Sequence, residues 1–455
     1  MKREIPGNCL KKIMLTIFLL ANTLVSFAGV DTIKVMAYNV LYYGNGCQGP
    51  DAEYHNYLAT ILKFASPDIV SLEKVASIKR SPDDEFGVAP YGFADSIIKY
   101  ACNTAFPDRY AYCTITNEAR ANNISVLFYD KTKFNFSNIV STYVNGTDYN
   151  TYKLYHLSLA GDSTFLYITC NHTKSGDEFE EVRELQVSGT FQTLKHHFKQ
   201  PCNHLFLGDF NARSSAEGFY QQLTNNTDTL FNFFDPPFFP DRQLKYPADW
   251  DHNSQFTRYF TTSTRESGSV PNACGSGGGG KNWYDHIFIS RRLTDQKNNI
   301  HYVPQSYRTI GNDGQRFKVS AINSNVHANS SAPKEVIDAI YHMSNKYPVM
   351  IDLLLDDKQG SSYTGTEMPY QNVIEKQDVT ILSASVDKMT IYFPSELTGQ
   401  ELIIEMIDEN NKSILEKKIT IKDSEYKLKY SLPQGKYIVK FKGRHNLVTT
   451  TSVTI

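Results

Sequence analysis

Short β-rich runs alternate with helical or loop-rich segments from Asp31 to about Asp357, and this alternation restricts the fold more than any other feature. Residues 33–38 are apolar and strand-like, residues 56–64 carry apolar side chains at helical spacing, and residues 69–72 return to a strand. Further strands are predicted at 124–129, 165–170, 204–207 and 286–289, and a helix is predicted at 180–197. Strands interleaved with helices favour a layered α/β or α+β fold.

The chain of 455 residues is long enough for more than one domain, and its composition changes after the first region. Residues 358–376 are polar and contain Gly and Ser, which predicts a linker. Residues 377–455 consist of strand-length runs separated by turn residues. This pattern predicts a small all-β sandwich.

The N-terminal segment has the features of a secretory signal peptide. Lys11 and Lys12 precede a short apolar run at 13–21, and small residues follow at Ser26 and Ala28. The run is shorter than the ~20 residues that a membrane-spanning helix needs, and no other stretch is long and apolar enough to cross a bilayer. We therefore expect residues 1–28 to be removed and the mature chain to be secreted or held at the cell surface.

Charge and cysteine content exclude few functions. The formal net charge is −2, so the chain has no overall attraction for a polyanion, although a local basic groove could still bind one. An exported chain with an even number of cysteines can form disulfides, whose pairing the sequence does not give. Removal of Cys9 with the signal peptide leaves six, and none has the spacing of a zinc site: Cys47, Cys102, Cys113, Cys170, Cys202 and Cys274.

The stretch LFLGDFNAR (205–213) is the strongest local indication of chemistry. A buried strand ends at Gly208, and Asp209 and Asn211 follow at its carboxyl end. An acid and an amide in this position can hold a water or a metal ion and orient a phosphate oxygen. Taken alone, Asp209 could equally well form an Asx turn.

Three other strands also present polar residues at an end. Asn39 ends the strand in VMAYNVLYYG, Asn171 and His172 end the strand in YITCNHTKSG, and Asp285 begins the strand in WYDHIFIS. Turn chemistry does not readily explain four such strands. We therefore expect these residues to form one site.

This set, in this order, resembles the endonuclease/exonuclease/phosphatase superfamily, which has the fold of deoxyribonuclease-I-like nucleases. The resemblance covers residues 33–357 and includes RANNISVLFYD and NDGQRFKVSAIN. It implies a four-layer, two-sheet α/β sandwich with the site at one end of the sheets. It also implies hydrolysis of a phosphate-containing substrate, nucleic acid among the candidates, with Mg²⁺ or Mn²⁺ as cofactor.

The resemblance implies a role for each matching residue. Asn39 would lie beside the metal site, and His172 would face the phosphate and pair with Asp285. Asp209 would bind or orient the attacking water, and Asn211 would hydrogen-bond a phosphoryl oxygen. Arg183, at the start of a helix, is expected to form a structural ion pair rather than to contact substrate.

Two departures from the family pattern affect the metal site and the phosphate site. PDIVSLEKV (67–75) has Lys74 in the position of the metal-binding glutamate, preceded by Glu73. Adjacent side chains on a strand point to opposite faces, so Glu73 could join Asp209 as a metal ligand only through a bulge. SNKYPV (344–349) has Asn345 and Lys346 where the family has an acid and a histidine.

These departures predict a degenerate site with weak or no hydrolysis, in which Lys74, Lys346 and Asn39 bind a phosphate-containing ligand and no metal cofactor is needed. One alternative is an active Mg²⁺-dependent nuclease or phosphodiesterase that uses Glu73 and Asp209. A second alternative is an adhesin-like surface protein that uses the aromatic loops at 231–250.

The C-terminal sequence SLPQGKYIVKFKGRHNLVTTTSVTI resembles the end of a type IX secretion sorting domain. Such domains have a Leu-Pro-x-Gly-x-Tyr turn before the last hairpin. No Asn-Pro motif opens this domain, and the chain ends in Thr-Ile, where a basic residue is common. A general β-sandwich binding or spacer module is the alternative.

Overall fold

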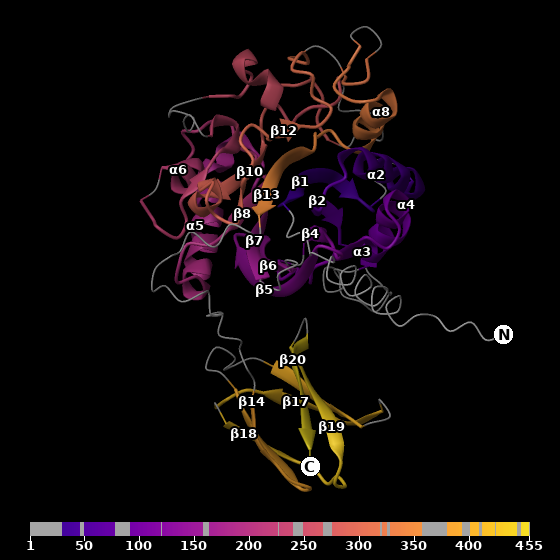
Figure 1. Cartoon of the computed structure of the whole chain (residues 1–455), viewed down its shortest axis with the longest axis vertical. Coiled ribbons are helices and arrows are strands. Elements are labelled where there is room, and N and C mark those ends of the chain that lie inside the picture. Colours follow the sequence, from indigo (N-terminus) through magenta and orange to yellow (C-terminus); the bar gives the residue numbers. More distant parts are fainter. Residues whose placement is uncertain are drawn as a thin grey trace, which may run out of the picture. The chain divides into compact units, whose positions relative to one another are not determined.

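The computed structural model divides the chain into two compact units, the first containing β1 to β13 and the second β14 to β20 (Figure 1). The predicted signal peptide and linker lie outside the described residues. Within the described residues, no helix is long and apolar enough to cross a membrane. The structure describes residues 30–45, 50–77, 92–119, 121–157, 163–225, 227–239, 249–266, 275–318, 321–324, 328–356, 380–393, 401–408, 412–423, 425–443 and 447–454.

One large sheet of the first unit has the strand order β11-β13-β1-β2-β4-β3, with β12 also paired to β13. β1 and β2 run parallel, and Asn39 lies opposite Glu73 in their register. The strands are β1 (Val30–Tyr43), β2 (Ile69–Ala76), β3 (Tyr110–Tyr112), β4 (Asn123–Asp130), β11 (Ile300–Tyr302), β12 (Arg308–Thr309) and β13 (Val349–Asp356).

The other large sheet has the order β5-β6-β7-β8-β10-β9. Its central strands place Asp209 opposite His172 on the parallel neighbour and opposite Asp285 on the antiparallel neighbour. The strands are β5 (Phe134–Val144), β6 (Thr147–Leu157), β7 (Ser163–His172), β8 (His204–Asp209), β9 (Phe233–Phe234) and β10 (Asp285–Ser290).

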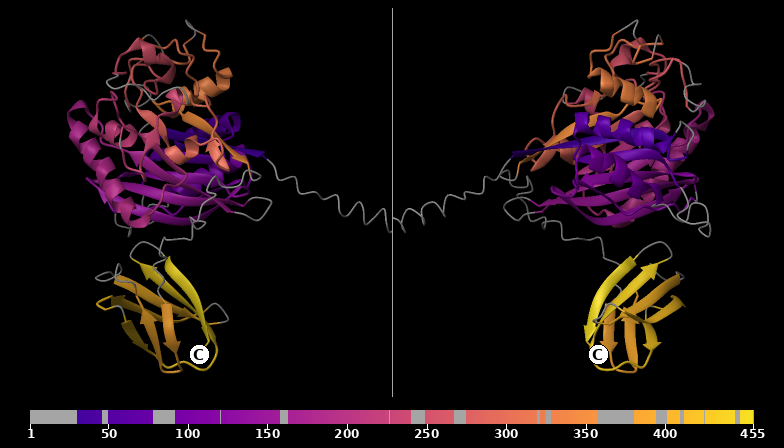
Figure 2. Two further views of the ribbon diagram at one scale, coloured as in Figure 1. Left: turned by 60° about the vertical axis from the view of Figure 1, so that its left-hand side comes forward. Right: turned by 90° about the vertical axis from the view of Figure 1, so that its right-hand side faces the viewer.

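The two sheets face each other, with β1 and β2 against β7, β8 and β10, and helices cover the outer faces (Figure 2). The predicted four-layer α/β sandwich is therefore confirmed. The helices are α2 (Asp51–Ala65), α3 (Gly92–Ser96), η1 (Ile97–Cys102), α4 (Asn103–Ala105), η2 (Asp177–Phe179), α5 (Glu180–His197), α6 (Gly218–Thr224), η3 (Pro236–Phe238), η4 (Ser254–Tyr259), α7 (Arg291–Thr294) and α8 (Lys334–Met343).

Gly208 allows the sheet to form close to the site. Its φ is +127°, which side-chain-bearing residues rarely adopt, and a Cβ there would lie 2.0 Å from the carbonyl oxygen of Asn171 on β7. Glycine at this position lets β8 approach β7 before Asp209 emerges.

Three aromatic side chains at 231–250 are not available for the surface expected of an adhesin. Phe231, Phe233 and Trp250 are fully buried. Phe231 and Phe233 stack on Phe191 of α5, with ring centroids 4.7 and 6.1 Å away. The expectation of an aromatic binding surface is wrong for these residues, because their rings pack in the core.

The second unit confirms the predicted all-β sandwich. Its sheets have the orders β14-β15-β18 and β17-β16-β19-β20, and they enclose an apolar core that includes Met389, Ile404 and Phe441. The strands are β14 (Thr380–Ala384), β15 (Lys388–Tyr392), β16 (Glu401–Ile407), β17 (Ser413–Thr420), β18 (Glu425–Lys429), β19 (Lys436–Gly443) and β20 (Leu447–Thr454).

The described cysteines form no disulfides. Cys102, Cys113, Cys170 and Cys202 are free and buried. They therefore act as small apolar side chains in the core. The other two cysteines of the expected mature chain, Cys47 and Cys274, lie outside the described residues.

Candidate functional site: a lysine among buried carboxylates

The strand ends bring the predicted site residues to one end of the two sheets. The parallel pairs β1–β2 and β7–β8 place the carboxyl ends of their strands there, and β10 begins beside the end of β8. The residues gathered in this way are Asn39, Glu73, His172, Asp209 and Asp285, and Lys346 reaches them from the segment before β13.

Asp209 is engaged on both carboxylate oxygens. Asn39 donates its side-chain amide to Oδ2 at 2.8 Å, and the Lys346 ammonium lies 2.8 Å from the same oxygen. The backbone N–H of Asn211 donates to Oδ1 at 3.0 Å. Burial would raise the pKa of Asp209, but Lys346 and its other neighbours hold it well below its usual range. Asp209 is therefore an ionised carboxylate held in place by three donors.

Asn211 holds two turns of the site together. Its φ is +48°, and its side-chain amide donates to the carbonyl oxygen of Thr173 at 3.0 Å. This bond ties the turn after β8 to the turn after β7. The contact uses one of the two N–H donors of the amide.

Lys346 is a buried cation, only 6% exposed. Its Nζ lies 2.8 Å from Asp209 and 3.6 Å from Asp285, and it sits over the ring of Tyr284, 4.5 Å from the centroid. Burial would lower its pKa, but the two carboxylates outweigh burial and raise it. Lys346 therefore stays protonated and forms the positive centre of the site.

Asp285 does not pair with His172 as the sequence suggested. Neither carboxylate oxygen of Asp285 has a hydrogen-bond partner, and neither does Nε2 of His172. Burial raises the pKa of Asp285, Lys346 opposes the rise, and the negative charge of Asp209 adds to it. Asp285 lies near the lysine and leaves His172 without the carboxylate partner that the sequence predicted for it.

A β-bulge in β2 brings both Glu73 and Lys74 to the site. Lys74 has a φ of +57°, and the pairing of β2 shifts register with β4 between Leu72 and Val75. A bulge breaks the alternation of side chains and re-aims them. Glu73 consequently faces the buried carboxylates, while Lys74 lines a cavity beside them.

Glu73 is a neutral acid rather than a metal-binding carboxylate. It is fully buried, its Oε1 accepts a hydrogen bond from the Ser71 hydroxyl at 2.6 Å, and its Oε2 has no partner. Burial raises its pKa well above the usual range, and Asp285 and Asp209 raise it further. A protonated carboxyl is a poor ligand for a cation.

The residues present do not fit the divalent cation that the family resemblance implies. Mg²⁺ prefers several negatively charged or neutral oxygen ligands in octahedral geometry. Here the ammonium of Lys346 already lies between Asp209 and Asp285. Within the described part of the chain, no three carboxylates, imidazoles or thiols are grouped to hold a metal ion.

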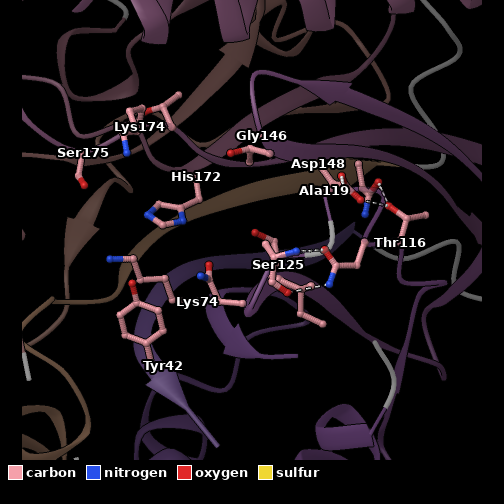
Figure 3. Close-up of a pocket in the computed structure, with 17 residues that line it drawn as sticks. Tyr42, Lys74, Thr116, Ala119, Ser125, Gly146, Asp148, His172, Lys174 and Ser175 are labelled. Atoms are coloured by element: carbon pink, nitrogen blue, oxygen red, sulfur yellow. Dashed lines mark hydrogen bonds between the residues drawn. The ribbon is translucent and has the colours of Figure 1, made fainter. Parts of the chain in front are cut away.

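A cavity of about 190 Å³ is lined by residues that include Lys74 and His172 (Figure 3). At one end, Lys74, His172, Lys174 and Tyr42 line it, and Lys74 lies 5.1 Å from the centroid of the Tyr42 ring. Burial lowers the pKa of Lys74 and the nearby Lys346 lowers it further, whereas Asp209 and Asp285 raise it. Burial lowers the pKa of His172 to about 3, and Lys74 contributes. His172 is therefore neutral near pH 7.

Arg183 forms a structural ion pair, as predicted. It is fully buried, and its Nε donates to Glu217 at 2.7 Å. Its Nη1 also donates to the carbonyl oxygens of Gly176 at 2.7 Å and Lys174 at 3.2 Å. Arg183 thereby fixes the turn that carries Lys174 at the cavity edge.

Asn345 supports the site from outside the carboxylate group. Its amide donates to the Ser276 hydroxyl at 2.8 Å, and its carbonyl oxygen accepts from the backbone N–H of Thr264. Gly275 lies so close that a Cβ there would be 2.9 Å from the side chain of Asn345. The glycine-rich segment thus packs against the turn that holds Lys346.

Sequence patterns did not single out Lys174, Asp148 or Thr116, which also line the cavity. Lys174 follows the predicted His172 by two residues and could have been found from that spacing. Asp148 and Thr116, at the other end of the cavity, had no local pattern that would single them out (Figure 3).

Similarity to known proteins was found only among solved structures. No protein-family model matches the chain, and no curated protein matches its sequence. Similar solved structures include TDP2 from D. rerio complexed with a single-strand DNA product (13% identity, 71% of this chain and 99% of that chain, TM-score 0.43). Others are the human Nocturnin catalytic domain with bound sulfate (14%, 71% and 97%, 0.41) and an endonuclease/exonuclease/phosphatase family protein from Bacteroides thetaiotaomicron (12%, 72% and 99%, 0.42).

Proposed function

We propose that the first unit binds a phosphate-bearing ligand in the cavity lined by Lys74, His172 and Lys174, without a divalent cation and with weak or no hydrolysis. The observation that carries this proposal is the position of Lys346, whose ammonium lies 2.8 Å from Asp209 and 3.6 Å from Asp285. The lysine neutralises charge that would otherwise attract a metal ion.

The electrostatic cost of adding a metal ion supports this reading. Two unit charges 4 Å apart interact by about 4 kcal/mol at an effective dielectric of 20, so an ammonium repels a dication at that distance by about 8 kcal/mol. Asp209 is already shared with Asn39 and Lys346. A divalent cation would have to displace the lysine before it could bind.

The cavity offers positive charge that is not used elsewhere. Within the described residues, neither Lys74 nor Lys174 forms an ion pair with a carboxylate, and each instead lies over an aromatic ring. Both line the cavity with His172. Ammonium groups form strong charge-assisted hydrogen bonds with phosphate oxygens.

His172 is poorly suited to act as a general base in this arrangement. A general base works best when its pKa is near the working pH, and burial lowers the pKa of His172 to about 3. Asp209 is engaged by three donors, and the Lys346 ammonium cannot lower the pKa of a water as a bound metal ion does. His172, Asp209 and Lys346 are therefore better suited to hold an anion than to activate a water against it.

A second candidate is a metal-dependent phosphodiesterase or nuclease that uses Glu73 and Asp209. The bulge at Lys74 favours it, because it turns Glu73 toward Asp209 and Asp285. For this candidate, Mg²⁺ or Mn²⁺ would have to deprotonate Glu73 and expel Lys346.

A binding experiment tests the leading proposal. Inorganic phosphate and phenyl phosphate are titrated into the full chain by calorimetry, with EDTA or with Mg²⁺. We expect binding that EDTA does not change and that weakens as salt is added. K74M and K174M should each weaken it, whereas K334M, which removes an exposed lysine paired with Asp338 on α8, should not. Absence of phosphate binding would refute the proposal.

A hydrolysis experiment separates the two candidates. The chain is incubated with bis-p-nitrophenyl phosphate and with plasmid DNA in Mg²⁺, Mn²⁺ or EDTA, beside the triple variant K74E/N345D/K346H. An inert wild type supports the binding protein. Cleavage that EDTA stops would favour the second candidate, and E73Q should then abolish it.

We also propose that the chain is exported after loss of residues 1–28 and that the second unit serves as a sorting or binding module. The N-terminal basic and apolar pattern and the C-terminal Leu-Pro-x-Gly-x-Tyr turn support this. Cell fractionation with mass determination of the mature chain tests it. An intact N-terminus in the cytosol would refute it.

A further inference from the structure

The end of the cavity opposite the lysines carries a negative charge. Asp148 lines the cavity there and accepts hydrogen bonds from the Thr116 hydroxyl at 3.0 Å and from the backbone N–H groups of Glu118 and Ala119 at 2.6 and 2.9 Å. All three donors are neutral. Among the described residues, no lysine or arginine forms an ion pair with Asp148.

This end of the cavity is built rigidly. Besides Asp148, the Thr116 hydroxyl contacts the Asn150 side-chain oxygen at 2.9 Å and the Ser141 hydroxyl at 3.0 Å. Thr116 and Asn150 are buried. The network fixes the carboxylate before any ligand arrives, which reduces the entropy that binding must overcome.

The cavity is therefore polarised. Figure 3 shows Lys74, His172 and Lys174 at one side and Asp148 and Thr116 at the other. An anion alone would use the lysines and leave the carboxylate facing it unfavourably. A molecule with a negative group at one end and a positive group at the other would satisfy both.

The size of the cavity restricts the ligand further. Its volume of about 190 Å³ lies below the roughly 300–1,000 Å³ of pockets that hold drug-sized ligands. A phosphate group and a short amine fit this space better than a nucleotide or a polymer segment.

We infer that the cavity binds a small compound that joins a phosphate group to a cationic amine, with the phosphate toward Lys74 and Lys174 and the amine toward Asp148. The inference rests on the proposed phosphate binding and adds the class of the ligand. The polarity of the charges, the fixed position of Asp148 and the small volume carry it.

The test compares matched ligands by calorimetry in EDTA on the full chain. Phosphoethanolamine carries the amine, ethyl phosphate lacks it, and N-acetylphosphoethanolamine retains the chain without the positive charge. Because hydrogen bonds to charged groups are the stronger kind, we expect phosphoethanolamine to bind about tenfold more tightly than either. D148N should remove this preference while inorganic phosphate still binds. D338N, a change at a partly exposed aspartate on α8, should leave the preference intact.

Each outcome separates the inference from the proposed function. Equal affinity for phosphoethanolamine and ethyl phosphate would overturn the inference and leave phosphate binding intact. No binding of these ligands or of inorganic phosphate would overturn both. If D148N fails to fold, the wild-type comparison of the three ligands still decides. Glycerophosphoethanolamine, a diester, distinguishes two sources of the ligand. If it binds as well as phosphoethanolamine, the ligand is a lipid-type headgroup. If it binds more weakly, the ligand is a free monoester.

Discussion

Replacing Lys346 by methionine should destabilise the first unit strongly. Methionine has a similar length but no charge, so Asp209 and Asp285 would remain buried without their shared cation. Removing one partner of a buried ion pair costs about 3–5 kcal/mol. The matched control K334M removes a lysine that is 74% exposed, and exposed ion pairs contribute about 1 kcal/mol or less.

Urea unfolding followed by tryptophan fluorescence measures this loss in the intact chain. The chain has two tryptophans, Trp250 and Trp283, and both are fully buried in the first unit. The signal therefore reports on that unit without interference from the second.

The pH dependence of the loss gives a second check. Without the ammonium, the folded-state pKa values of Asp209 and Asp285 rise. A raised folded-state pKa favours the folded state at low pH and costs stability as the pH rises. The deficit of K346M should therefore be larger at pH 8 than at pH 5, and D209N should reduce it. A deficit below about 1 kcal/mol at pH 8 would refute the buried ion pair.

Three further variants test other parts of the first unit by the same unfolding assay. R183M should cost about 3–5 kcal/mol because it leaves Glu217 buried without its cation, and a loss below 1 kcal/mol would contradict that. G208A should destabilise by more than about 4 kcal/mol, because its Cβ would overlap the carbonyl oxygen of Asn171, and a folded variant of normal stability would disprove the close approach. Between pH 6 and 4, the free energy of unfolding of H172N should fall by about 1.4 kcal/mol less per pH unit than that of the wild type. Burial lowers the pKa of His172 to about 3, so in this range only the unfolded wild-type chain gains that proton. Parallel pH profiles of the two proteins would argue against this.

Much of the fold could be predicted because local patterns and final structure agree. The helix predicted at 180–197 is α5 (Glu180–His197), and the apolar run at 69–72 lies within β2. The hairpin of β5 and β6 is not among the predicted strands. Its residues alternate between buried and exposed, as in Tyr143, which is 57% exposed, so it has no continuous apolar run.

The site was predicted in its members but not in its contacts. The pairing of β8 with β7 and β10 brings Asp209 beside His172 and Asp285. The polar residues at strand ends in the sequence indicate this grouping. The sequence indicated a bulge only as the condition for Glu73 to reach the metal site, because nothing in the residue type of Lys74 requires a left-handed backbone. The contact of Asp148 with Thr116 joins residues 32 positions apart and depends on how a loop meets the start of β6.

The buried lysine also makes the charge balance of the site independent of the surrounding solution. A dissolved cation occupies a site according to its concentration, so dilution or a chelator can remove it. Lys346 is covalently attached to the chain, and a group tethered in this way acts at a high effective concentration, on the order of millimolar or more. The ammonium of Lys346 therefore lies beside Asp209 in every folded chain. A dissolved cation that competes for this position must overcome the high effective concentration of the lysine as well as its repulsion.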